Sequence, residues 1–231
     1  MHYSVAQNVP LITEKGEGQM SVSTGTETFG IQGAYGITNS ISVMGSFSNG
    51  VDDMIGDGDN LGIYDFNNGL RQSGELAVGY HCPIMPNVLF EIYGGAERYY
   101  RSYSFASIQY SDSFSTNMTK PFIQLDLGFL NDKNNGLGLS CKFGGLFYDH
   151  YSDKSNGSST IGNYFPPSKI TEPIIEPCLT YRFGGWGVSG QLQIGTTLIA
   201  YPAAIVASEV YVSAGIQVRI YDFLQPGKPE E

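Results

Sequence analysis

Apolar and polar residues alternate along much of this 231-residue chain, most clearly near its C-terminus. Within residues 210–220, every second position is apolar: Val210, Val212, Ala214, Ile216, Val218 and Ile220. The positions between them are Tyr211, Ser213, Gly215, Gln217 and Arg219. Since successive side chains of a strand point to opposite faces, a period of two predicts a strand with one apolar and one polar face. Residues 186–199 repeat the pattern, and the two runs predict a hairpin.

The same criterion predicts ten strands along the chain. They cover residues 16–25, 28–37, 41–50, 71–81, 87–104, 114–130, 137–148, 172–183, 186–199 and 206–222. Most connections alternate between short turns and long loops, and both termini fall on the side of the short turns. This arrangement predicts an all-β fold, a closed up-and-down antiparallel barrel. We divide the chain into a periplasmic N-terminal segment (1–15), a barrel (16–223) and a C-terminal tail (224–231).

The two faces of the predicted strands distinguish a soluble barrel from a membrane barrel, because only a membrane barrel turns its apolar face outward. The polar face carries too many charges for a soluble core: Glu75, Glu91, Glu97, Asp126, Lys142, Glu176, Arg182, Glu209 and Arg219. Aromatic residues on the apolar phase gather near the short-turn ends, where membrane barrels have an interfacial girdle: Tyr35, Tyr80, Phe129, Phe183, Trp186 and Phe223. We therefore predict a transmembrane barrel in the outer membrane of a Gram-negative bacterium.

The composition narrows the function classes. A formal net charge of −10 argues against nucleic acid as a partner. Thirty glycines and only 15% charged residues are typical of a β-rich protein, and no apolar run is long enough for a membrane helix. The three cysteines, Cys82, Cys141 and Cys178, lack paired spacing, so we expect isolated small hydrophobic side chains. No leader precedes Met1, and we expect that one was removed.

Two stretches resemble a known group of proteins. NVPLITEKGEGQM (8–20) and FGIQGAYGITNSISVMGSFS (29–48) resemble the N-terminal part of small outer-membrane β-barrel proteins of the Bacteroidetes type, several of them predicted lipoproteins. The resemblance implies a leader and, in the lipoproteins, a lipid-bearing cysteine ahead of His2. The last strand, with Gly215, Val218, Ile220 and Phe223, is similar to the C-terminal signal that the barrel-assembly machinery recognises.

The inward charges are the most specific feature of the sequence. A ten-stranded barrel is narrow, and an unpaired charge inside it costs several kcal/mol, so the charges must pair or be hydrated. We expect a salt-bridge network that plugs the lumen, with Arg182 and Arg219 held by Glu176, Glu209 or Asp126. A conducting pore is the alternative.

Candidate catalytic groups are sparse. Omptin-type proteases, which are ten-stranded barrels, carry paired aspartates and an Asp/His couple on opposite walls, and this chain offers Asp52-Asp53 and Asp149-His150. Adjacent residues of a strand point to opposite faces, however. A Ser–His arrangement could only use His150 with Ser152 or Ser155. We predict that the chain is not an enzyme.

No motif for a cofactor is present, and we expect none. The weak calcium candidate is an acidic loop that lacks the spacing of a known calcium loop: Asp52, Asp53, Asp57 and Asp59. The function that we favour is a structural, adhesion or docking component of the envelope, in a larger outer-membrane complex. A rim-located hydrolase and a narrow channel for small solutes are the alternatives. The expected partners are outer-membrane lipid and lipopolysaccharide, the barrel-assembly machinery and another outer-membrane protein.

Overall fold

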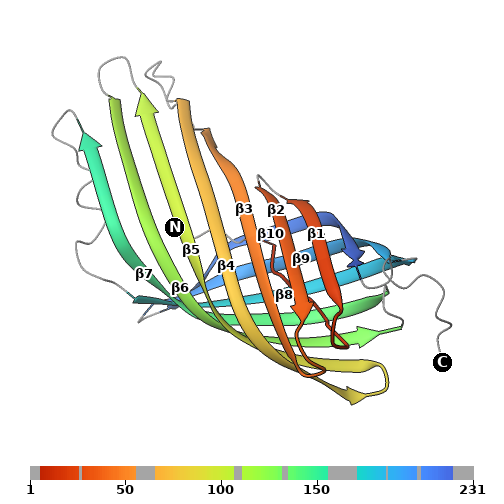
Figure 1. The fold of residues 1–231 in the computed structure, drawn as a ribbon. Coiled ribbons are helices and arrows are strands. Elements are labelled where there is room, and N and C mark those ends of the chain that lie inside the picture. Colours follow the sequence, from red (N-terminus) through yellow and green to blue (C-terminus); the bar gives the residue numbers. More distant parts are fainter. Residues whose placement is uncertain are drawn as a thin grey trace.

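A computed structural model describes residues 6–25, 28–55, 66–106, 111–131, 135–155, 171–185, 187–201 and 204–220. These residues form ten antiparallel strands that close into one barrel (Figure 1). The strands are β1 (Gly18–Gly25), β2 (Thr28–Gly36), β3 (Ile41–Ile55), β4 (Phe66–Met85), β5 (Val88–Ala106), β6 (Ser111–Leu130), β7 (Gly136–Ser155), β8 (Thr171–Gly185), β9 (Val188–Tyr201) and β10 (Ala204–Arg219). Each strand pairs with its neighbours in the chain, and β1 pairs with β10 to close the barrel. The predicted closed barrel is confirmed.

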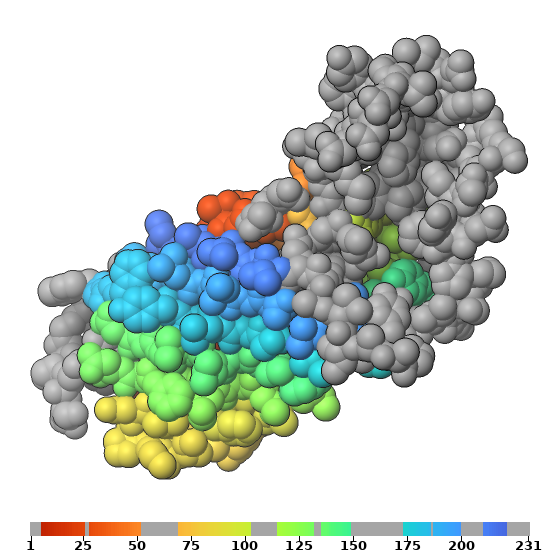
Figure 2. All heavy atoms as spheres, turned by 180° about the vertical axis from the view of Figure 1, so that it is seen from behind, coloured from red at the N-terminus to blue at the C-terminus, as the bar shows by residue number. Residues whose placement is uncertain are grey.

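The outer surface is apolar. Its large hydrophobic side chains are exposed, as in Leu76 (76%), Ile216 (62%) and Ile123 (54%). Figure 2 shows this surface from behind, with β5–β10 following one another side by side. A soluble monomer rarely exposes a continuous apolar patch of more than a few hundred Å², so a belt around the whole barrel indicates a surface that faces lipid.

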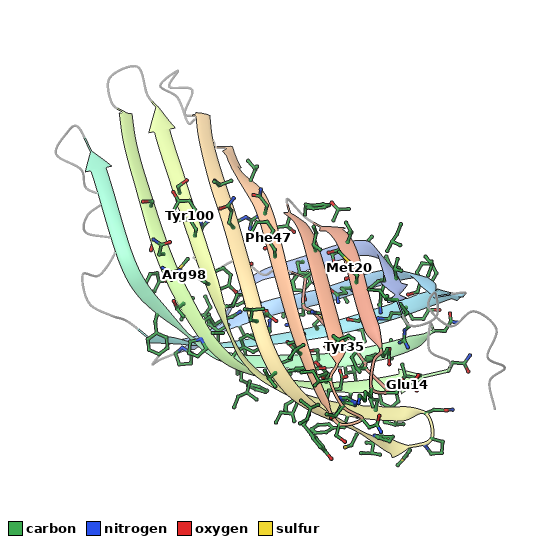
Figure 3. All side chains as sticks on the ribbon, viewed as in Figure 1. Glu14, Met20, Tyr35, Phe47, Arg98 and Tyr100 are labelled. Carbon is green, nitrogen blue, oxygen red and sulfur yellow. The ribbon has the colours of Figure 1, made fainter. Side chains whose placement is uncertain are left out.

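The predicted aromatic girdle lies largely on this belt. Tyr35, Tyr80, Phe129 and Phe183 are exposed near the short-turn ends of their strands, whereas Trp186 and Phe223 lie outside the described residues. Figure 3 shows Tyr35 near the lower end of β2 and Met20 farther up on β1. Among the described residues, no helix is both long enough and apolar enough to cross a membrane.

Short connections join β2 to β3, β4 to β5, β6 to β7 and β8 to β9 at one end of the barrel. In the first of these turns, the Thr38 hydroxyl accepts hydrogen bonds from the N–H groups of Ser40 (3.1 Å) and Ile41 (2.8 Å). In the last, Gly187 has a φ of 72°, a conformation that glycine adopts without steric cost. Membrane barrels have their short turns on the periplasmic side, which fixes this end as periplasmic.

The strands differ in length, so the outer rim is uneven. β4, β6 and β7 each have 20 residues, whereas β1 has 8 and β2 has 9. In Figure 1, β3–β7 rise as a curved sheet well past the ends of β1 and β2. We call residues 49–55, 66–72, 98–106, 111–119 and 148–155 the raised wall. On β5 it begins at Arg98, an exposed charged residue in the outward phase (Figure 3).

Candidate functional site

A chain of alternating charges crosses the lumen. Lys120 on β6 lies 2.9 Å from Glu97 on β5 and 2.7 Å from Glu176 on β8. Lys142 on β7 lies 2.6 Å from Glu75 on β4 and 4.0 Å from Glu97. All five side chains are almost fully buried. Because each ammonium lies between carboxylates from other strands, the network ties five of the ten strands together across the interior.

Aromatic rings complete the surroundings of the two lysines. The Lys120 ammonium lies 5.2 Å from the ring centre of Tyr99, and that of Lys142 lies 4.5 Å from the ring centre of Phe122. Both distances are within the range of a cation–π interaction, which gains strength when the cation is desolvated. A buried ion pair adds little net stability over an apolar pair, but losing one partner is costly. Each charged group of the network is therefore needed to keep its partners paired inside the lumen.

The second component of the site is the N-terminal segment. Residues 6–12, here called the N-terminal strap, run inside the barrel. The expectation that residues 1–15 lie in the periplasm does not hold for this part. Lumen side chains donate hydrogen bonds to five consecutive strap carbonyls: Gln32 to Ala6 (2.7 Å), Gln193 to Gln7 (2.8 Å), Gln124 to Asn8 (2.7 Å), and Arg182 to Val9 and to Pro10 (2.9 Å).

The turn at Leu11 and Ile12, at the C-terminal end of the strap, is held by a carboxylate. Glu91 accepts hydrogen bonds from the N–H groups of Leu11 (3.0 Å) and Ile12 (2.8 Å). Leu11 has a φ of 56°, a left-handed conformation that costs a bulky residue about 1–3 kcal/mol. Two N–H groups converging on one carboxylate compensate for this strain. Glu91 therefore holds the strap rather than an arginine.

The apolar residues of the strap pack against the barrel wall. Val9, Leu11 and Ile12 are 0–1% exposed. A Cβ atom at Gly128 would lie 2.6 Å from Leu11 Cδ2, and one at Gly138 would lie 3.2 Å from Val9 Cγ1. These two glycines leave the space that the strap fills.

At the periplasmic end, Glu17 anchors the strap to the barrel. Its carboxylate lies 2.9 Å from the Arg219 guanidinium and accepts hydrogen bonds from the Thr13 N–H (2.7 Å), the Thr13 hydroxyl (2.8 Å) and the Gln19 amide (2.7 Å). Burial alone would raise the pKa of Glu17, but Arg219 and these hydrogen bonds hold the pKa below its ordinary value. The anchor is therefore ionised at neutral pH.

The structure places most of the sequence-predicted charges in the lumen, each no more than 6% exposed: Glu75, Glu91, Glu97, Asp126, Lys142, Glu176, Arg182 and Arg219. The side chain of Glu209, on β10, lies outside the described residues. Among the described residues, the two arginines have other partners than the expected Glu176 and Asp126. Arg182 donates to the strap, and Arg219 pairs with Glu17. The alternation reveals which residues point inward, but it does not reveal the stagger of the strands or a segment inside the barrel.

Sequence analysis also missed Lys120 and Glu17. Lys120 is on the same phase as Gln124 and Asp126 in the predicted strand 114–130, so strict counting could have found it. The clear alternation of apolar residues begins only after Pro121, so Lys120 lies outside the part of this strand with a visible pattern. Glu17 lies at the start of the predicted strand 16–25, and nothing in the sequence indicates its partner.

A charged, filled lumen inside an apolar outer surface is the reverse of a soluble barrel, in which the apolar face is inside. The fold is that of an outer-membrane β-barrel. In this outer-membrane barrel, the exposed belt crosses the membrane and the short turns face the periplasm.

Comparisons with known proteins agree on the fold. No family model matches the chain, and no curated protein sequence matches it. The outer membrane protease OmpT from Escherichia coli is similar over 88% of this chain and 93% of its own, with a TM-score of 0.53 and 11% identity. The translocator domain of the autotransporter NalP from Neisseria meningitidis is similar over 88% of this chain and 86% of its own, with a TM-score of 0.50 and 11% identity.

The prediction that the chain is not an enzyme is corrected by this likeness, because a protease has the same kind of barrel. The prediction relied on spacing within single strands, whereas catalytic groups in a barrel come from different strands. Asp52-Asp53 lie on β3 and Asp149-His150 on β7, with β4–β6 between them on one side of the barrel. Their side chains lie outside the described residues.

The calcium candidates also lie largely outside the described residues. The calcium candidates Asp57 and Asp59 lie outside the described residues, as do the side chains of Asp52 and Asp53. Within the described part of the chain, no group of three or more His, Cys, Asp or Glu residues is placed to hold a metal ion. Cys82, Cys141 and Cys178 are free thiols on three different strands.

Proposed function

We propose that this outer-membrane barrel is a plugged, non-conducting platform that presents its raised wall outside the membrane for docking or adhesion within the cell envelope. The observation that carries the proposal is the N-terminal strap, which is hydrogen-bonded to the lumen at every carbonyl from residue 6 to residue 10. Conduction needs a continuous hydrated path with sites that an ion can leave easily. The strap and the charge network occupy that path.

The raised wall supports the external role. On β5 it runs from Arg98 to Ala106, nine residues, or roughly 30 Å at the usual rise per residue. The pairing continues along it: Asn49, Gln72, Tyr100, Asn117 and His150 form one cross-strand row on β3–β7. These strands are longer than a strand needs to be to cross the hydrocarbon layer, so their outer parts extend beyond it. Exposed Arg98 and Tyr100 are residue types enriched at protein interfaces.

The proposed partners follow from these surfaces. The apolar belt would contact outer-membrane lipid and lipopolysaccharide, and the barrel-assembly machinery would insert the chain. The raised wall would contact another outer-membrane protein in a larger complex. From the resemblance of residues 8–48, we also propose that the chain is of the Bacteroidetes type, with a lipid anchor ahead of the strap in its precursor.

Planar-bilayer recording tests the plug. We expect the full chain to show no wide, steady conductance, and deletion of residues 6–12 to produce one. The control replaces residues 6–12 with a Gly-Ser segment of the same length, which keeps the connection to Thr13 but loses the apolar packing. A wide, steady conductance from the full chain would contradict the proposal.

Site-specific photo-crosslinking in intact cells tests the docking role. A photoreactive residue at Tyr100, on the raised wall, should form a discrete crosslink to a protein. The matched position is Ile194, which is 49% exposed on the lipid-facing belt and should give no such product. Protein crosslinks at Ile194 but not at Tyr100 would move the docking surface from the raised wall to the lipid-facing belt.

A further inference from the structure

The strap runs from the periplasmic end of the barrel toward the outer mouth. Ile12 is next to Gly36, the last residue of β2, where a Cβ atom would lie 3.0 Å from Ile12 Cγ2. Farther along the strap, the Asn8 amide donates to the Gly33 carbonyl (2.9 Å), and Gln32 holds the Ala6 carbonyl (2.7 Å). The contacts on β2 thus move steadily away from the periplasmic turn.

The opposite wall gives the same direction. Val9 lies against Gly138, near the periplasmic start of β7. Gln7 accepts a hydrogen bond from Ser140 (2.9 Å) and donates to the carbonyl of Glu176 (2.7 Å), which is nine positions from the periplasmic end of β8 at Gly185. On both walls, therefore, Ile12 is nearest to the periplasmic end of the barrel and Ala6 is nearest to the outer mouth.

The lumen binds the strap mainly through its main chain. Seven consecutive residues each use a main-chain carbonyl or N–H group, and the lumen partners are amide, guanidinium and carboxylate groups on β2, β5, β6, β8 and β9. Only Gln7 and Asn8 add polar side-chain contacts to the described barrel residues. Such an array recognises a polypeptide main chain, and the space beside Gly138 and Gly128 adds a preference for apolar side chains at the positions of Val9 and Leu11.

We infer that the lumen is a binding site for an extended polypeptide main chain, and that it holds the strap so that residues ahead of Ala6 are delivered to the outer side of the membrane. This goes beyond the platform role, which requires only that the lumen be closed. From the level of Gln32, β2 continues outward for four residues to Thr28, or about 13 Å. Eight added residues span up to about 27 Å, enough to pass that rim.

Surface detection of an epitope tests the direction. An eight-residue epitope is inserted directly before Ala6, and antibody binding is compared between intact cells and cells with a permeabilised outer membrane. The expected result is full binding to intact cells. The control carries the same epitope at Asn39, in the periplasmic β2–β3 turn, and should bind antibody only after permeabilisation. Binding before Ala6 that also requires permeabilisation, in a barrel that keeps heat-modifiable mobility, would overturn the inference.

A second pair of variants tests the binding site. Arg182→Met removes the donor to two strap carbonyls, so the equilibrium constant for binding of the strap in the lumen should fall by about tenfold or more, and the intact-cell signal should fall with it. Arg98→Met removes an arginine that is exposed on the outward phase of β5, away from the lumen, and should leave the signal unchanged. An unchanged signal in Arg182→Met would overturn the main-chain binding site.

A smaller reporter covers the case in which the epitope prevents folding. Ser4→Cys is made in a chain with Cys82→Ser, Cys141→Ser and Cys178→Ser, and intact cells are treated with a membrane-impermeant thiol reagent. Labelling from outside supports the inference. Labelling only after permeabilisation overturns it.

Discussion

Gly128→Ala should weaken the barrel because it places a methyl group where the strap already lies. The new Cβ atom would lie 2.6 Å from Leu11 Cδ2, 3.1 Å from Cδ1 and 3.3 Å from Cγ. Ordinary contact would need a shift of about 1 Å, yet Leu11 is fully buried and its N–H is held by Glu91 at 3.0 Å. Overpacking of this kind costs about 1–3 kcal/mol. At 2 kcal/mol, the folding equilibrium changes by roughly 30-fold.

Urea unfolding in detergent micelles measures this loss. The control is Gly94→Ala on β5, where an added Cβ atom has no heavy atom within 4 Å. Its free energy of unfolding should stay within about 0.5 kcal/mol of the wild type. Both substitutions exchange the same residues within strands, so the difference isolates the contact with the strap.

Leu11→Ala completes a double-mutant cycle. Alone, it should cost about 2–5 kcal/mol, because it empties a buried site. Combined with Gly128→Ala, the loss should be smaller than the sum by about 0.5–3 kcal/mol, since the new methyl group enters the vacated space. Strict additivity, or equal stability of Gly128→Ala and Gly94→Ala, would refute the placement of the strap against β6.

Three further predictions concern charges and lipid. Lys120→Met removes the ammonium that lies nearest to two buried carboxylates, Glu97 and Glu176, and should lower the free energy of unfolding by about 3–5 kcal/mol, against almost nothing for the exposed Lys15→Met, in the same urea assay. The folded-state pKa of Glu17 is lowered, so the stability that its carboxylate contributes is complete above the unfolded-state pKa of about 4.3 and is lost as pH falls through the folded-state pKa. In urea unfolding from about pH 7 to about pH 3, the free energy of unfolding should therefore fall more steeply in the wild type than in Glu17→Gln. Ile194→Arg, on the lipid-facing belt, should cost about 2–4 kcal/mol and reduce the heat-modifiable fraction on gels, whereas Ile194→Leu should not.

The membrane-spanning part of the fold could be predicted because lipid imposes a pattern on the sequence. Each spanning strand must turn apolar residues to lipid on alternate positions, so the period of two is strong there. Outside the membrane this requirement ends, and the predicted strands stopped too early. The prediction 41–50 corresponds to β3 at Ile41–Ile55, and 71–81 corresponds to β4 at Phe66–Met85. The raised wall was therefore missed on β3, β4 and β7, whereas the predicted strands 87–104 and 114–130 covered most of it on β5 and β6.

The lumen could be predicted only in part. Its charged residues were identifiable from their phase, but their partners depend on which positions the stagger of the barrel brings together. Lys142 and Glu75 are 67 residues apart in the sequence and meet at 2.6 Å. No local pattern encodes such a pair.

By itself, the sequence determined the closed barrel, its apolar outer face and its charged inner face, because alternation is a local property of each strand. The tertiary structure alone decided what fills the lumen. Residues 6–12 have no strand-like alternation and no charge, so nothing local marks them as a strap. Their place depends on glycines at 128 and 138, on Glu91 and on Arg182, which only barrel closure brings around one segment.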